Sequence, residues 1–255
     1  VVATDVDGVV TTFEKTILVD TTAPTISGAI PASGKVVLGD SAISAAFADA
    51  GGASIDTTGV TITVNGVDVT DDAEITAAGV TYAPDVALAD GAVNVVVSGL
   101  KDSAGNAATA LSWTYTADNT GPAVGATTPE ALTKDRTPEI SAQFSDVAGV
   151  DVDTIVFTLT SAVEGLDDEI ALSAIAWDAD NSTATVTPIS ALEDGRYVVT
   201  VKASDVLGNE GDLVSWEFEV DSLSPVVADV MPESGTWLSN PTPTIGVAVI
   251  DRNAV

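Results

Sequence analysis

The phrase Asp-x-x-x-Pro occurs three times in this chain, and its spacing limits the fold more than any other feature. The copies start at Asp20, Asp118 and Asp221, which lie about one hundred residues apart. A fixed period of domain size predicts a row of similar modules rather than one large domain. We call these three residues the marker aspartates. A second proline follows each of them after eleven residues, at Pro31, Pro129 and Pro232.

An Asp-x-x-Gly loop near the end of each period supports the same register. It occurs as Asp102-Ser-Ala-Gly-Asn106, as Asp205-Val-Leu-Gly-Asn209 and, in altered form, as Asp5-Val-Asp-Gly-Val9. We therefore expect whole modules at residues 20–117 and 118–220, the end of a preceding module at 1–19 and the start of a following one at 221–255. The two end segments together have about half the length of a module, so we do not expect them to close a domain.

Apolar and polar residues alternate in many short runs, which is the pattern of strands with one buried face. Turn signals such as Asn65-Gly66 and Asp90-Gly91 separate the runs. About seven short strands per hundred residues predict an all-β chain of tandem immunoglobulin-like β-sandwiches, arranged end to end as a rod. A closed barrel fits less well, because the modules follow one another with almost no linker. The clearest runs lie at residues 60–64, 93–97, 155–159, 184–186 and 197–201.

The chain is strongly acidic, with 38 acidic residues against 8 basic ones and a formal net charge of -30. Such a surface repels nucleic acids and anionic membranes, so neither is an expected partner. No segment approaches the roughly 20 apolar residues of a membrane span, and we expect no membrane insertion. The acidity fits simple solubility, a saline habitat or divalent-cation binding, because hard cations prefer carboxylate oxygens.

Catalysis is not expected from this composition. The chain has neither histidine nor cysteine, and its serines lie in strands or turns without a suitable base nearby. No disulfide can staple the modules, so their stability has to come from their cores. Hydrophobic residues make up 45% of the chain, which is enough to give each module a core of its own. The sequence therefore predicts a structural or binding protein.

The positions of certain acids are more informative than their number. In an immunoglobulin-like sandwich, the start of the first strand lies at the same end as the B–C loop and the F–G loop. A marker aspartate and one acid from each loop therefore meet at one end of each module, and an Asn accompanies the F–G acid. The expected groups are Asp20, Asp49, Asp102 and Asn106, then Asp118, Asp146, Asp205 and Asn209, and, in the partial module, Asp221 and Asp251.

Like charges gathered at one end would repel one another unless a cation lies between them. Ca²⁺ takes about 6–8 oxygen ligands in adaptable geometry, which carboxylates, an Asn amide and backbone carbonyls can supply. Zinc is not expected, because its favoured His and Cys ligands are missing. The alternative is that these aspartates only accept backbone N–H groups in Asx-turns. The sequence leaves both explanations open, and calcium at the joints between modules is the sharper hypothesis.

The strings Val19-Asp-Thr-Thr-Ala-Pro24 and Asp102-Ser-Ala-Gly-Asn106 resemble the tandem bacterial Ig-like repeats of giant secreted or cell-surface adhesins. The resemblance covers both whole modules and the end segments. It implies extender rods whose joints are stiffened by calcium, and ligand-binding domains elsewhere. It also implies that the marker aspartates are linker ligands and that Asp102 and Asp205 are loop ligands. The loop at Asp5 departs from the pattern, because Val9 stands where the other loops have Asn.

The leading expectation is a non-catalytic spacer from a large, repetitive extracellular adhesin, whose partners are neighbouring modules of the same chain. The proline after each marker aspartate restricts the joint, because it fixes φ and removes a donor. The alternative is a building block of an extracellular filament or surface layer, in which like subunits pack through unpaired strand edges. A third reading is a module that binds glycan or protein through its loops. Each reading places the chain in the secreted or cell-surface compartment.

Overall fold

The structure is a computed structural model that describes residues 1–162 and 169–251. It divides the chain into two compact units, Val1–Asn119 and Thr120–Val255, and each is described here by itself. The described residues are almost entirely β-structure, with one short 3-10 turn, η1 (Thr70–Asp72). No helix among them is long and apolar enough to cross a membrane. The expected all-β fold class is confirmed.

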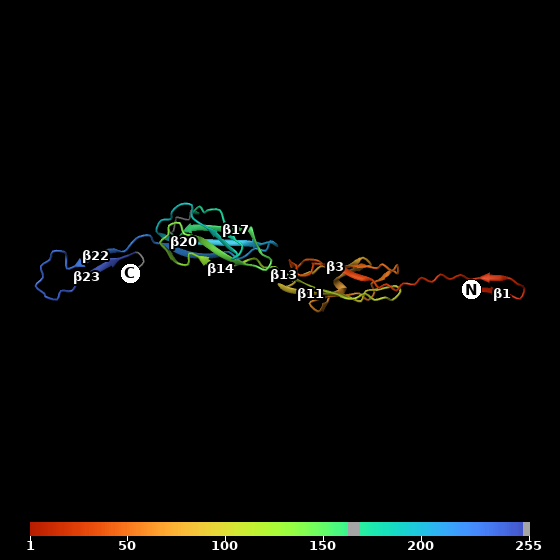
Figure 1. Ribbon diagram of the computed structural model, residues 1–255. Coiled ribbons are helices and arrows are strands. Elements are labelled where there is room, and N and C mark those ends of the chain that lie inside the picture. Colours follow the sequence, from red (N-terminus) through yellow and green to blue (C-terminus); the bar gives the residue numbers. More distant parts are fainter. Residues whose placement is uncertain (163–168, 252–255) are drawn as a thin grey trace. The chain divides into compact units, whose positions relative to one another are not determined.

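Unit 1 contains an immunoglobulin-like sandwich of two facing sheets (Figure 1). Its strands are β3 (Thr25–Ile30), β4 (Val36–Val37), β5 (Ile43–Ala48), β6 (Ile55–Asp56), β7 (Thr61–Val64), β8 (Val67–Asp68), β9 (Glu74–Thr76), β10 (Gly79–Tyr82), β11 (Gly91–Ser98), β12 (Lys101–Asp102) and β13 (Leu111–Ala117). One sheet has the order β3-β5-β10-β9 and the other β4-β13-β11-β7-β8, while β6 and β12 form a small separate pair. These orders correspond to strands A-B-E-D and A′-G-F-C-C′ of the immunoglobulin fold.

The alternating pattern of the sequence explains the core of unit 1. Val93, Val95 and Val97 of β11 are fully buried, while Asn94 between them faces solvent, so the strand turns one face to the core. Trp113 and Tyr115 of β13 are buried beside them in the same cluster. The strands end where the turn residues predict it. At the β7–β8 hairpin, Asn65 and Gly66 have φ values of 51° and 81°, which suit a tight two-residue turn.

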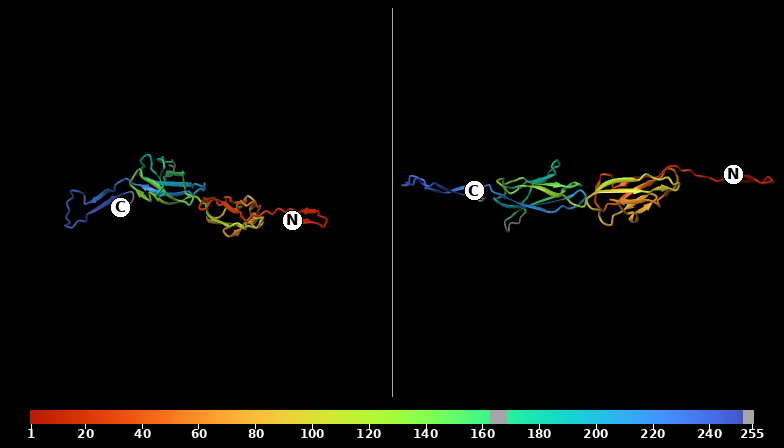
Figure 2. Two further views of the ribbon diagram at one scale, coloured as in Figure 1. Left: turned by 45° about the vertical axis from the view of Figure 1, so that its right-hand side comes forward. Right: turned by 90° about the horizontal axis from the view of Figure 1, so that it is seen from below.

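Unit 2 repeats this architecture as a second sandwich (Figure 2). It has a core cluster of its own. Its sheets have the orders β14-β16-β19-β18 and β15-β21-β20-β17. The strand β17 is long and lies at the edge of its sheet, and it contains an irregularity in register between Asp151 and Val156. The strands are β14 (Ala123–Thr128), β15 (Leu132–Thr133), β16 (Ile140–Ser145), β17 (Val150–Ser161), β18 (Ala176–Asp178), β19 (Thr183–Val186), β20 (Gly195–Asp205) and β21 (Val214–Val220).

The two end segments form two-stranded hairpins that belong to neither sandwich. β1 (Val2–Thr4) pairs with β2 (Val10–Thr12), and β22 (Val226–Met231) pairs with β23 (Gly246–Ile250). Large apolar side chains of both hairpins are exposed, because two strands alone cannot bury an apolar face. The module boundaries inferred from the sequence stay predictions.

Candidate metal centre

Three aspartates from distant parts of unit 1 meet at one place. Asp20 precedes β3, Asp49 follows β5, and Asp102 ends β12 in the loop between β11 and β13. Each of these residues offers a carboxylate oxygen, and the three oxygens all lie within 4.8 Å of one another. We call these residues the acid cluster. The structure therefore brings together the three acids that the sequence placed at one end of this module, and their role as metal ligands stays a prediction.

Asp102 is the most buried member of the acid cluster, with a relative exposure of 2%. Its Oδ1 accepts the backbone N–H groups of Ala104 and Asn106 at 3.0 and 2.8 Å, and its Oδ2 accepts Nδ2 of Asn106 at 2.7 Å. Burial alone raises the pKa of this carboxyl. The hydrogen bonds from the Asn106 side chain and from the backbone of the loop outweigh burial, and they hold the pKa below its usual value. Asp102 is therefore a carboxylate at neutral pH.

Asn106 uses its amide nitrogen to tie the linker to this loop. Besides Asp102, Nδ2 donates to the backbone carbonyls of Asp20 at 3.2 Å and Thr22 at 3.3 Å. The sequence predicts Asn106 as a ligand through its amide. The contacts that the structure shows are those of a donor, and coordination by its oxygen stays a prediction.

The loop at Asp5 shows which part of this arrangement needs Asn. Asp5 Oδ1 accepts the N–H groups of Asp7 and Val9, and Asp5 N–H donates to the Val9 carbonyl, which repeats the backbone pattern of the Asp102 loop. The turn therefore forms without an amide side chain. The contribution of Asn106 beyond the turn is its contact with the linker carbonyls.

The carboxylate of Asp20 sits in a cradle formed by the loop after β5. Its Oδ1 accepts the N–H of Thr22 at 2.9 Å, and its Oδ2 accepts the N–H of Ala53 at 2.8 Å. A Cβ at Gly51 would lie 2.1 Å from Asp20 Oδ1, so the carboxylate fills the space that any side chain at position 51 would need. Glycine at this position is thus explained by close approach of a carboxylate rather than by the turn alone.

Asp49 has one carboxylate oxygen that the turn does not use. Its Oδ1 accepts the N–H of Gly51 at 3.0 Å, which is an ordinary Asx-turn contact. Its Oδ2 is buried and has no hydrogen-bond partner among the described residues. An Asx-turn uses only one oxygen, and leaving a buried polar group unsatisfied costs about 1–3 kcal/mol. The turn alone does not account for Oδ2, whereas a cation would.

Among the described residues, no ion pair joins a basic side chain to the acid cluster. Within the described part of the chain, the ion pairs are Arg136–Glu193 at 2.9 Å and Arg196–Glu219 at 3.6 Å, and both lie in unit 2. The polar contacts of the three acids are N–H groups, which are neutral donors. Three carboxylates in one place repel one another, and a cation would offset that repulsion.

The corresponding acids of the next module behave similarly. Asp118 lies at the end of unit 1, whereas Asp146 and Asp205 lie in unit 2, and coordination by these three residues stays a prediction. Asp205 Oδ1 accepts the N–H of Asn209 at 2.8 Å and Asp205 Oδ2 accepts its Nδ2 at 2.8 Å, as in the Asp102 loop. Asp146 Oδ1 accepts the N–H of Gly149 at 2.9 Å, as in a turn.

The last pair of expected ligands is not part of such a group among the described residues. Asp221 Oδ1 accepts the N–H of Leu223 at 3.1 Å, and Asp251 follows β23. The described residues of this segment hold no position equivalent to Asp102. Coordination by Asp221 and Asp251 stays a prediction.

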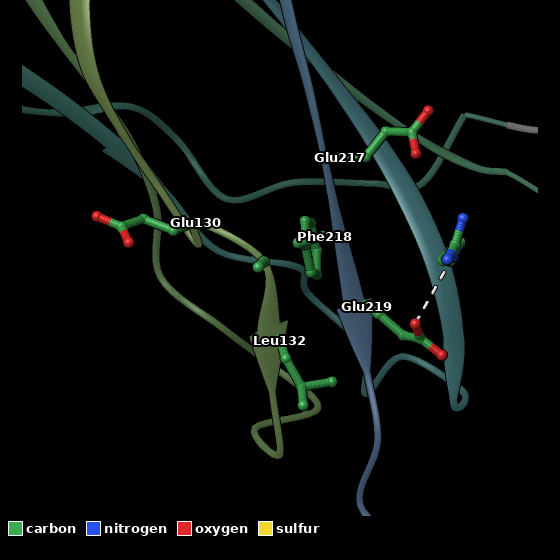
Figure 3. Close-up of a pocket in the computed structure, with 7 residues that line it drawn as sticks. Glu130, Leu132, Glu217, Phe218 and Glu219 are labelled. Carbon is green, nitrogen blue, oxygen red and sulfur yellow. Dashed lines mark ion pairs between the residues drawn. The ribbon is translucent and has the colours of Figure 1, made fainter. Parts of the chain in front are cut away.

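A groove on unit 2 is a weaker candidate for a ligand site. It lies beside β15 and β21 and is lined by acidic and apolar side chains, including Glu130, Leu132 and Glu217. Figure 3 shows Glu130 and Glu217 pointing away from one another, so they do not converge on a ligand. Glu219 forms the ion pair with Arg196. The acid cluster of unit 1 is the better candidate site.

Substitution of Gly51 tests whether the cradle positions the Asp20 carboxylate. We expect Gly51→Ala to lower calcium affinity at least tenfold, because the new Cβ would displace both oxygens of Asp20. Isothermal titration with calcium measures the change. Gly195→Ala is the matched control, since a Cβ at position 195 would meet nothing within 4 Å. Equal affinity in the two variants would show that the position of Asp20 does not matter for binding.

Comparison with known families gives one clear result. Residues 118–220 match the family model described as bacterial Ig-like domain. This match agrees with the immunoglobulin-like sheet order of unit 2. Comparison with curated proteins gives no match.

Solved structures of similar proteins are only distantly alike. The copper resistance protein PcoC from Escherichia coli is 20% identical, covers 39% of this chain and 99% of its own, and has a TM-score of 0.33. The fibronectin(III)-like modules of CbhA from Clostridium thermocellum are 15% identical, cover 77% of this chain and 93% of their own, and have a TM-score of 0.30. At these scores the likeness carries no argument about function, and the fold is assigned from the order of the strands.

Proposed function

We propose that this chain is a non-catalytic spacer segment of a large, repetitive extracellular adhesin, with calcium stiffening the joints between its modules. The observation that carries the proposal is the acid cluster of Asp20, Asp49 and Asp102, in which one buried carboxylate oxygen lacks a partner among the described residues. The match of residues 118–220 to the bacterial Ig-like domain supports an extracellular structural role. The absence of histidine and cysteine from the sequence supports a role without catalysis.

The residues of the acid cluster suit calcium better than other cations. Asp49 Oδ2 would be a ligand. Both oxygens of Asp20 and Oδ2 of Asp102 each accept one N–H group, so each keeps a second lone-pair direction for a cation. Calcium accepts such carboxylates together with carbonyls and water in flexible geometry. When bound, it would offset most of the negative charge of the cluster and crosslink the linker to two loops. Magnesium is less suitable, because it demands near-octahedral geometry and keeps its own water.

Asp20 gives the ion a mechanical role. Asp20 belongs to the segment that leads into β3, whereas Asp49 and Asp102 belong to loops of the sandwich. An ion held by all three would fix the direction in which the chain enters the module. In a row of modules this would make each joint stiffer, and neighbouring modules would be the partners that feel the effect.

A building block of a filament or surface layer is the second candidate, and one observation favours it. The strand β17 has twelve residues and lies at the edge of its sheet, with one isolated bridge between Thr160 and Glu169 on its outer side. An unpaired strand edge is a template for pairing with another chain. Like subunits could associate laterally through this edge.

Small-angle scattering and analytical ultracentrifugation in a concentration series distinguish the two candidates. A spacer is expected to stay monomeric at high concentration in millimolar calcium, and its maximum dimension is expected to fall when calcium is chelated. A layer or filament subunit is expected to self-associate. Association that grows with concentration would reject the spacer, and an unchanged maximum dimension after chelation would reject calcium stiffening.

A further inference from the structure

The residues that follow β13 are held by a second set of contacts, which includes no residue of the acid cluster. From these contacts we infer that each module holds the marker aspartate through its backbone and the residue after it through an Asp-Gly turn, so that part of the joint's stiffness needs no metal. We call this arrangement the exit latch. The inference rests on the proposed spacer function, but the exit latch can be tested in the absence of calcium.

In unit 1 the exit latch centres on Asn119. The backbone N–H and the Nδ2 of Asn119 both donate to Asp90 Oδ1, at 2.8 and 2.7 Å. Nδ2 also donates to the Leu88 carbonyl at 2.9 Å, and Oδ1 accepts the N–H of Gly39 at 3.0 Å. One side chain thus joins the loop after β4 to the loop before β11. The donor and acceptor capacity of the amide is well used, which gives the contact a defined geometry.

Glycine at position 39 is required by this arrangement. A Cβ at Gly39 would lie 2.3 Å from the Leu88 carbonyl oxygen and 2.8 Å from the Asn119 side chain. The backbone of the two loops is also joined directly, because Leu88 N–H donates to the Gly39 carbonyl at 3.0 Å. The loops and Asn119 therefore form one close-packed contact rather than a surface side chain resting on a turn.

Unit 2 repeats the exit latch with a different side chain. The backbone N–H and the Oγ of Ser222 both donate to Asp194 Oδ1, at 3.0 and 2.7 Å. Asp194 stands before Gly195 at the start of β20, just as Asp90 stands before Gly91 at the start of β11. The acceptor is an aspartate in both units, and the donor is the residue after a marker aspartate in both. Recurrence in two modules argues against a chance surface contact.

The marker aspartate itself is gripped at its backbone. Asp118 N–H donates to the Val37 carbonyl and Asp221 N–H donates to the Thr133 carbonyl, both at 2.9 Å, so each continues the pairing of the last strand. Asp20 shows how a marker aspartate contacts the module that follows it. Its side chain accepts the N–H of Ala53, which belongs to that module. Taken together across the repeat, the marker position belongs to both modules.

The test uses the whole chain, whose lack of cysteine allows two spin labels at Thr81→Cys and Ser215→Cys, both exposed strand positions. Asn119→Ala is expected to broaden the distance distribution between the labels in chelator, where no metal contributes. The matched control is Asn181→Ala, which removes another amide that donates to an aspartate, Asp178, in an exposed turn. Equal widths for the Asn119 and Asn181 variants in chelator would overturn the inference.

Two further measurements keep the result interpretable. Amide exchange at Gly39 is expected to rise about tenfold in Asn119→Ala while amides of β11 keep their protection, which shows a local loss rather than unfolding. Asp90→Ala removes the acceptor and is expected to broaden the distribution in the same way. If calcium has no effect on the parent chain but these variants broaden it, the calcium proposal fails and the exit latch stands. If calcium narrows the distribution and these variants do nothing, the exit latch fails.

Discussion

Calcium at about 10 mM is expected to raise the melting temperature of unit 1 by about 10 °C over chelator-treated protein. A ligand bound only by the folded state stabilises it by RT ln(1 + [L]/Kd), which is about 1.4–2.7 kcal/mol if Kd is about 10⁻³–10⁻⁴ M, as in extracellular calcium modules. For a domain of about 100 residues, each kcal/mol shifts the melting temperature by about 4–8 °C. Calorimetry with chelator and then with calcium measures the shift.

Ionic strength has to be matched in this experiment, because the chain carries a net charge of -30. Any salt screens repulsion among surface carboxylates and stabilises an acidic protein to some extent. Sodium chloride at equal ionic strength is expected to give a small, graded shift, and calcium a larger one that saturates. A shift of the same size in both salts would mean that calcium acts only by screening.

The variant Asp49→Asn tests whether the calcium-dependent rise in melting temperature depends on Asp49 Oδ2. The amide oxygen of the new side chain can still accept the N–H of Gly51, so the turn is kept, while an NH₂ group replaces the unpartnered Oδ2. In chelator the variant is expected to melt no lower than the parent, since one of three repelling charges is gone. In calcium the variant is expected to lose the rise in melting temperature that the parent shows.

Relative to the parent, Asp49→Asn is thus expected to melt no lower in chelator but lower in calcium. A structural defect would lower the melting temperature in both conditions, so the comparison separates metal binding from such a defect. Asp56→Asn is the matched control, because Asp56 is a half-buried acceptor for Thr58 outside the acid cluster. It removes the same charge and is expected to keep the full calcium increment. If Asp49→Asn keeps the increment as well, calcium is not bound at this cluster.

The sequence was sufficient for the parts of the fold that depend on periodicity. Alternation placed β7, β11 and β20, and the order of strands in the immunoglobulin fold brought Asp20, Asp49 and Asp102 to one end. These inferences required only the assignment of each residue to a strand or a loop. The start of β17 at Val150 was missed, because its first residues include Asp151 and Asp153, and a register irregularity interrupts the alternation there.

The contacts of single atoms could not be predicted in the same way. Spacing places Asn106 in a loop, but only the packed geometry shows that its amide donates to the linker carbonyls. The exit latch was overlooked for a similar reason, since Asp90-Gly91 was interpreted only as a turn. A usable signal was present: Asp-Gly recurs at the start of the same strand in both modules, and a small polar residue follows Asp118 and Asp221.

Replacement of one core residue is expected to have the largest effect of all and to stay within one unit. Ile62 is fully buried in the core cluster of unit 1. Ile62→Ala removes buried methyl groups and leaves a cavity, which costs about 2–5 kcal/mol. At about 4–8 °C per kcal/mol, the melting temperature of unit 1 falls by about 10 °C or more. Leu159→Ala, in the core cluster of unit 2, is the reciprocal variant.

Calorimetry is expected to show that each variant moves one transition and leaves the other in place, because the two core clusters share no residue. Movement of both transitions together would show that the units unfold as one cooperative body. Independent unfolding matters for the proposed spacer. Modules that unfold separately on heating or under force leave their neighbours folded. Independent unfolding also assigns the calcium increment: with unit 1 identified by Ile62→Ala, the increment lost in Asp49→Asn has to come from that same transition.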